Sequence, residues 1–101
     1  MTPRAVVLRE RAKQDVRDTM RWYERARTGL GLGFADAVEA ALVRIESVAE
    51  TFPKVHGEVR RCLIGRPFRS YGVFFTIAAN SVLVIAVLHL RTNPMRWRRR
   101  R

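Results

Sequence analysis

The sequence predicts an α+β fold of the order β-α-α-β-β-β, with a helical hairpin packed on one face of a mostly antiparallel four-stranded sheet. Three observations carry this prediction. Apolar residues recur with helical period over residues 10–26 and again over 34–49. Residues 58–64 and 68–78 alternate along the chain as half-buried strands do. The run from 82 to 88 is unbroken and apolar, which is typical of a strand buried on both faces.

The first strand is expected at 4–9, directly after Pro3, and the two helices follow it. Along the first helix the residues of one face recur at spacings of three and four: Ala12, Val16, Thr19, Met20, Tyr23 and Ala26. The glycines at 29, 31 and 33 are interpreted as the turn of the hairpin, because glycine readily adopts positive φ. The second helix has a similar face: Phe34, Val38, Ala41, Leu42, Ile45, Val48 and Ala49. Pro53 then ends it.

The last three strands are expected to form an antiparallel meander, entered through a loop around His56 and Gly57. Residues 65–67 and 79–81 supply its two turns. Side chains alternate along a strand, which predicts one shared face in the closing strand: Leu83, Ile85, Val87, His89 and Arg91. His89 and Arg91 would therefore project together where the strand ends.

The 101 residues are expected to form one domain, 1–101, whose residues 94–101 are a basic tail. Residues 1–50 carry nine Lys/Arg and eight Asp/Glu, a net of +1, whereas 51–101 carry eleven Lys/Arg and only Glu58, a net of +10. Almost all these cations are arginines, which suit bidentate recognition of phosphate or carboxylate. The second half is therefore expected to attract nucleic acid, an acidic protein, or both.

Several classes of protein are excluded by the composition. No apolar run reaches the length of about 18 residues that a membrane-spanning helix needs, and no signal peptide is recognisable, so a soluble cytoplasmic protein is expected. One cysteine, Cys62, and two distant histidines give no metal-ligand spacing, and no cofactor is predicted. No serine or cysteine has the context of a nucleophile in a catalytic triad.

His89 is the candidate for proton transfer. If Arg60 reaches the same face as His89 and Arg91, the imidazole is ringed by guanidinium groups that could hold a phosphate and favour the neutral base. The alternative, which we favour from the sequence alone, is that His89 only caps the strand end with a hydrogen bond.

Five arginines and one tryptophan of the second half are candidate contacts for a target or for nucleic acid: Arg60, Arg66, Arg69, Arg91, Arg96 and Trp97. Trp97 could stack on a base. The alternative, which we favour, is that it folds the tail back onto the sheet. The terminal arginines, 98–101, are interpreted as a solvated, disordered end.

The chain resembles the RelE/ParE toxins of bacterial type II toxin-antitoxin systems along nearly its whole length. The resemblance rests on the order and spacing of short motifs: Trp22-Tyr23, Leu30-Gly31 before Phe34, Pro53, Val59-Arg60, Arg66-Pro67-Phe68-Arg69 with Tyr71 and Val73, Val87 to Arg91, Pro94 and Trp97. It implies the β-α-α-β-β-β fold, a cytoplasmic growth inhibitor, and neutralisation by an antitoxin encoded beside it. An arginine-bearing sheet face and an exposed helical hairpin suit an acidic, partly disordered antitoxin, which we expect the gene just upstream to encode.

Two activities are implied by the family, and the sequence favours one. RelE-like members cut messenger RNA on the ribosome, and for them Arg60, His89 and Arg91 would be catalytic. ParE-like members block DNA gyrase. Leu90 stands where some of the RNases carry tyrosine, Thr92 replaces a common arginine, and no lysine cluster precedes Arg60. We therefore expect a non-enzymatic ParE-like inhibitor of gyrase, with an mRNA endoribonuclease as the alternative and a basic nucleic-acid-binding module as a third possibility.

Overall fold

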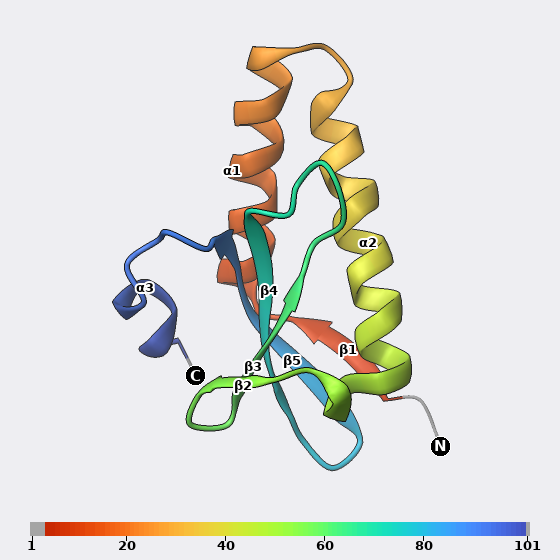
Figure 1. Ribbon diagram of the computed structural model, residues 1–101, viewed down its shortest axis with the longest axis vertical. Helices are drawn as coiled ribbons and strands as arrows, with labels where there is room; N and C mark the ends of the chain where they lie inside the picture. The colour runs from red at the N-terminus through yellow and green to blue at the C-terminus, as the bar shows by residue number, and fades with distance from the viewer. Residues whose placement is uncertain (1–3, 101) are drawn as a thin grey trace.

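The computed structural model describes residues 4–100 and confirms an α+β fold (Figure 1). Its elements, in chain order, are β1 Ala5–Leu8, α1 Glu10–Ala26, α2 Leu30–Val48, a 3-10 turn Ala49–Thr51, β2 Lys54–His56, β3 Val59–Leu63, β4 Tyr71–Ile77, β5 Ser81–His89 and α3 Met95–Arg98. Residues 1–3 and 101 lie outside the described part of the chain. The predicted domain 1–101 and the predicted tail 94–101 are therefore compared with the structure only within residues 4–100.

The sheet has five strands in the order β1-β5-β4-β3-β2, not the four expected. β1 runs parallel to β5 and every other pair is antiparallel, as predicted for the meander. The missed strand is β2, which lies in the segment predicted as a loop and pairs with β3 beyond Gly57. Gly57 has a φ of 54°, which allows the tight turn. Three residues are too few to show an alternating pattern.

Residues 68–70 were expected in the second strand of the meander, but they form a turn ahead of β4. The N–H of Phe68 donates to the carbonyl of Gly65, and the N–H of Tyr71 donates to the carbonyl of Phe68. Phe68 nevertheless belongs to the main core, where it meets the ring of Phe34 edge-on at 5.2 Å between ring centroids. This aromatic contact holds the turn against α2.

The main core lies between the helical hairpin and the sheet, as the two helical stripes predict. Phe34, Ala41 and Ile45 from α2 have no exposed surface, and neither has Ala12 from α1. The opposite face of the sheet has a second cluster of buried residues, which was not predicted: Val59, Phe74, Ile85, Ala86, Leu88 and Trp97. Both faces of β5 are therefore buried, as the apolar run predicts.

The glycine cluster plays a different part from the turn that we expected. α2 begins at Leu30, so Gly31 and Gly33 are helical and only Gly29, with a φ of 89°, has the left-handed conformation. The carboxylate of Glu24 on α1 accepts hydrogen bonds from the N–H groups of Gly29 and Gly31. Gly31 lets the two helices approach closely, since a Cβ there would lie 2.7 Å from the carbonyl oxygen of Met20.

Replacing Gly31 with alanine is therefore expected to lower the free energy of unfolding by about 2 kcal/mol, because the methyl group meets backbone that cannot move aside alone. Gly33→Ala is the matched control in the same helix turn. A Cβ at Gly33 meets only the Phe68 ring at 3.8 Å, so this variant is expected to gain up to about 1 kcal/mol from helix propensity. Urea denaturation of both variants measures the difference, and equal effects would refute the close approach as its cause.

A β-bulge in β5 changes the predicted face of the closing strand. Phe74 pairs with Ala86 and Phe75 pairs with Val84, so Ile85 is an extra residue on β5. Val87 consequently faces the helices, whereas Ile85 faces the second cluster. The prediction that Ile85 shares a face with Val87 and His89 is wrong, because an all-apolar run gives no sign of where its alternation shifts.

The end of the chain is also different from the solvated tail that we expected. α3 packs on the second face of the sheet, apart from the α1–α2 hairpin (Figure 1). Trp97 is 6% exposed and stacks on Phe74 with 4.5 Å between ring centroids. This confirms the interpretation in which Trp97 folds the tail back onto the sheet.

Arg100 ends this packing with a buried ion pair to Asp15 on α1. Its Nη1 donates to Asp15 Oδ2 at 2.6 Å and its Nη2 to Oδ1 at 3.2 Å. The same two residues also form hydrogen bonds with backbone groups of β5 at the bulge. Arg100 donates to the carbonyl of Ile85, and Asp15 accepts from the N–H of Val87 at 3.0 Å. The pair thus joins the tail, the first helix and the irregular part of β5.

Candidate functional site

An open groove of about 530 Å³ lies where β5 ends, beside the turn that precedes β4. It contains three of the predicted site residues, His89, Arg91 and Arg69. The rest of its lining was not predicted as part of the site: Leu63, Pro67, Ser70 and Leu90. The N–H of Leu90 donates to the carbonyl of Ser70 at 2.7 Å, which fixes the two sides of the groove to each other.

His89 is half-buried, and one of its ring nitrogens is already bonded. The backbone N–H of Arg91 donates to Nδ1 of His89 at 3.0 Å. Nδ1 is thus an acceptor in this arrangement, which places the proton of the neutral ring on Nε2. This is the strand-capping role that we weighed against catalysis. To take a proton from a substrate, the ring would have to give up this bond or change its tautomer.

The ring of Tyr71 packs against the imidazole of His89. The two residues are opposite one another in the β4–β5 pairing, and their rings meet edge-on at 5.1 Å between centroids. Burial, followed by the neighbouring Tyr23, raises the pKa of Tyr71 to about 12. The phenol therefore stays protonated at neutral pH. Its contribution is to pack against the imidazole rather than to exchange protons with it.

The raised pKa of Tyr71 can be measured. The neutral phenol contributes stability that is fully present below pH 10, the ordinary value, and is lost as the pH rises through about 12. An ultraviolet absorbance titration of the two tyrosines is expected to show one late step, and the variant Tyr71→Phe is expected to lack it. A late step that persists in Tyr71→Phe would assign the shift to Tyr23 instead.

Arg60 is not brought to His89. It lies opposite Phe75 on β4, whereas His89 lies opposite Tyr71, four residues or about 13 Å further along the strand. The guanidinium of Arg60 donates to the carbonyls of Glu50 and Phe52, at 3.0 and 2.7 Å. These carbonyls belong to the end of the second helical segment and the residue after it, so Arg60 caps that end.

The remaining predicted residues lie around the groove rather than in it. Arg66 is exposed in the turn before β4. Arg96 is exposed and lines a neighbouring hollow beside Trp22, Tyr71 and Leu88. Trp97 is buried against Phe74, so its ring is covered in this conformation. Of the predicted cations, Arg69 and Arg91 therefore share the groove with His89, and Arg66 lies in the adjoining turn.

Other chemistry finds little support among residues 4–100. Cys62 has no exposed surface, and burial raises the pKa of its thiol, which disfavours the nucleophilic thiolate. Within the described chain no group of three or more His, Cys, Asp or Glu side chains could hold a metal ion. No helix in this part is long and apolar enough to cross a membrane.

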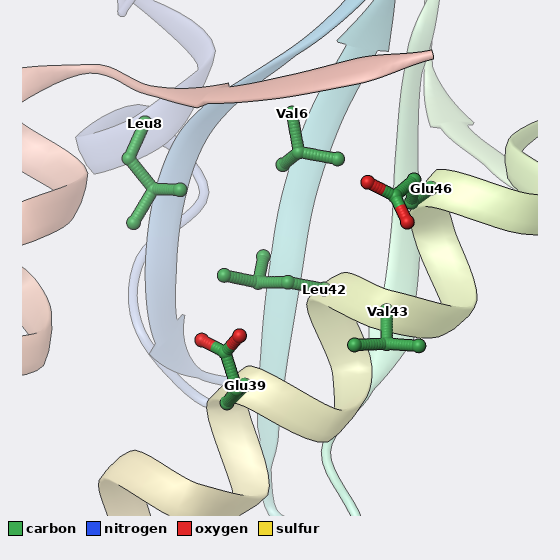
Figure 2. Close-up of a pocket in the computed structure, with 6 residues that line it drawn as sticks. All are labelled: Val6, Leu8, Glu39, Leu42, Val43 and Glu46. Carbon is green, nitrogen blue, oxygen red and sulfur yellow. The ribbon is translucent and has the colours of Figure 1, made fainter. Parts of the chain in front are cut away.

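A second hollow, of about 270 Å³, lies between β1 and α2 and contains none of the predicted site residues (Figure 2). Val6 and Leu8 on β1 and Leu42 on α2 form its apolar floor, and Glu39 and Glu46 stand at its rim. Among the described strands β1 pairs only with β5, so its other edge is open. An open strand edge beside apolar side chains is a common place for another chain to bind.

Sequence reasoning missed the role of Asp15 and Arg100, which hold the β5 segment leading to His89. One signal was available for Asp15. It stands three residues after Ala12 and four before Thr19, on the face that the helical period marks as buried. A carboxylate at such a position requires a partner. Nothing in the run of terminal arginines indicated which of them would supply it.

The comparisons agree with this architecture. A family model described as ParE toxin of type II toxin-antitoxin system, parDE, matches residues 6–94. A solved structure described as a chromosomal ParDE TA system from P. aeruginosa matches with a TM-score of 0.76 and 12% sequence identity. The match covers 88% of this chain and 98% of the other. At that identity the likeness speaks for the fold alone. No curated protein matches the chain.

The family match spans α1, α2, β1 from its second residue, the other four strands and the groove with Arg69, His89 and Arg91. It ends at Pro94, immediately before α3. α3 and Arg100, which bonds to Asp15, therefore lie outside the matched region; we call the Asp15–Arg100 ion pair the clasp. The chain belongs to the family of ParE toxins of type II toxin-antitoxin systems.

Proposed function

We propose that this protein inhibits bacterial growth by binding DNA gyrase in the cytoplasm, and that a cognate antitoxin neutralises it. Membership of the ParE family supports the toxin class. The observation that carries the choice of a binding mechanism is the arrangement around His89. Its Nδ1 already accepts from the N–H of Arg91, and Arg60 is engaged with the carbonyls of Glu50 and Phe52.

An RNA-cleaving site needs a group to take a proton and a cation to stabilise the charge on the phosphorane, both close to one phosphate. Here the candidate base and Arg60 are about four residues apart along β4, and Arg60 is bound elsewhere. What the groove offers is a surface of mixed character. Arg69 and Arg91 provide charge, while Leu63 and Leu90 are 46% and 38% exposed and provide apolar contact. Such a surface suits protein recognition.

The proposed antitoxin has a chemistry that follows from the surface. Its acidic residues would meet the arginines of the second half, which carries a net charge of +10. Its apolar residues would cover the hollow between β1 and α2 (Figure 2), whose floor is apolar. A partly disordered segment can follow both regions as it folds on binding. We expect the gene just upstream to encode this protein.

Expression in cells tests the proposal. Induction of the chain alone is expected to stop growth with filamentation and a DNA damage response, and co-expression of the upstream gene is expected to restore growth. Primer extension on translated messages from the same cells is expected to show no cuts within codons. Growth arrest with such cuts and no DNA damage response would replace gyrase with the ribosome as the target.

A further inference from the structure

A third hollow, of about 440 Å³, is bordered by both ends of the chain. It is lined by Arg9, Glu10 and Arg11 at the start of α1, by Arg99 and Arg100 from the tail, and by Ile85 on β5. The Asp15–Arg100 ion pair holds these segments together although they are 85 residues apart in the sequence. None of the predicted target-binding residues lies in this hollow.

The charges in the hollow do not cancel. Glu10 is within 3.8 Å of Lys13 and 3.7 Å of Arg17, and Arg100 is paired with Asp15. Arg9, Arg11 and Arg99 are all exposed, and none has an ion pair or side-chain hydrogen bond with another residue of the described chain. Three guanidinium groups therefore share this space with one carboxylate of the lining, that of Glu10, so the lining keeps a net positive charge.

The start of α1 adds positive potential at the same place. Arg9 is the N-cap of the 17-residue helix α1 and makes no side-chain cap hydrogen bond, and Glu10 is the acidic residue of the first turn beside the positive end of the helix dipole. Arg100, whose charge is paired with Asp15, also lines the hollow, and its buried Nε has no hydrogen-bond partner among the described residues. Guanidinium groups beside free helix N–H groups are the donors that bind phosphate.

We propose that Arg9, Arg11 and Arg99 form a site that binds the phosphate backbone of nucleic acid. An acidic protein segment is the competing partner, but such a segment gains much of its affinity from apolar contacts as it folds. The hydrophobic residue in the lining, Ile85, is only 2% exposed, so the hollow gives a folding segment no exposed hydrophobic side chain to cover. Charge alone is sufficient for a backbone contact. The inference does not depend on gyrase being the target of the toxin. Its test measures DNA binding by the purified chain alone, so either hypothesis can fail without the other.

The test is the affinity of the purified full chain for a short mixed-sequence DNA duplex, measured by fluorescence anisotropy over a range of salt concentrations. The variant R9Q/R11Q/R99Q is expected to bind at least about tenfold more weakly than the parent. The slope of log affinity against log salt is expected to fall by about 2 to 3, at about 0.9 for each phosphate that the variant no longer neutralises. R9K/R11K/R99K keeps the charge and is expected to keep most of the slope.

The matched control is R21Q/R25Q/R27Q, which removes the same charge from exposed positions toward the other end of α1 and the hairpin turn. Its slope is expected to change by less than about 1. Equal losses in the two glutamine variants would overturn the site, because binding would then reflect net charge alone. It would also be overturned if polyglutamate bound to the parent while DNA and RNA duplexes did not. Circular dichroism verifies that each variant is folded.

Discussion

Asp15→Asn is expected to lose about 3 to 5 kcal/mol of unfolding free energy, the range measured when one partner of a buried ion pair is removed. Asp15 and Arg100 each have side chains only 6% exposed, so the remaining guanidinium would stay buried without a counter-charge. Asparagine can still accept from the N–H of Val87. The loss therefore reports the charge of the pair rather than the hydrogen bond beside the bulge.

Asp18→Asn is the matched control, because Asp18 is exposed on the same helix and bonds only to Gln14 and Arg21. It is expected to change stability by less than about 0.5 kcal/mol. The double variant D15L/R100M removes both charges and is expected to be more stable than Asp15→Asn alone. Denaturant unfolding measures all three proteins. Equal stability of Asp15→Asn and Asp18→Asn would contradict the claim that the Asp15–Arg100 ion pair stabilises the fold.

Reversing the charge of the groove is expected to have the largest effect on function. The variant R69E/R91E should fold with parental stability, since both side chains are exposed and neither has an ion pair among residues 4–100. Its affinity for the target is expected to fall at least about a hundredfold, because like charges at an interface cost several kcal/mol. Cells that express it should grow like cells with an empty vector.

His89 separates binding from cleavage in the same experiment. Its Nδ1 accepts the N–H of Arg91, and a glutamine at this position can keep an acceptor there while losing the imidazole. His89→Gln is therefore expected to inhibit growth almost as strongly as the parent. R25E/R27E, which changes exposed arginines in the last turn of α1 and at its C-cap, serves as the charge control. Full growth with His89→Gln would give the imidazole a chemical role and weaken the binding mechanism.

Most of the fold was predictable because its signals are local. The periods of 3.6 and 2 identified α1, α2, β3 and β4, and the unbroken apolar run 82–88 was correctly assigned to a doubly buried strand, β5. β2 escaped because three residues carry no period. The bulge at Ile85 escaped because every residue around it is apolar, so a shift of one position changes nothing in the pattern.

The site was predictable only in part. His89, Arg91 and Arg69 do line one groove, because the end of β5 and the turn before β4 are neighbours in the meander. Arg60 was grouped with them from its neighbouring strand, but strand pairing puts it about four residues away. The packing of the tail could not be predicted, because it depends on contacts between residues that are far apart in the sequence. Which arginine reaches Asp15 depends on how α3 packs Trp97 against Phe74.

The central claim is that the toxin acts by binding gyrase, and purified components test it most directly. The chain is added to gyrase and plasmid DNA, and separately to ribosomes translating a defined message. We predict loss of supercoiling or accumulation of cleaved DNA in the first reaction, shared by His89→Gln and absent with R69E/R91E, and an intact message in the second. Undisturbed gyrase together with a message cut within codons, abolished by His89→Gln, would contradict the account.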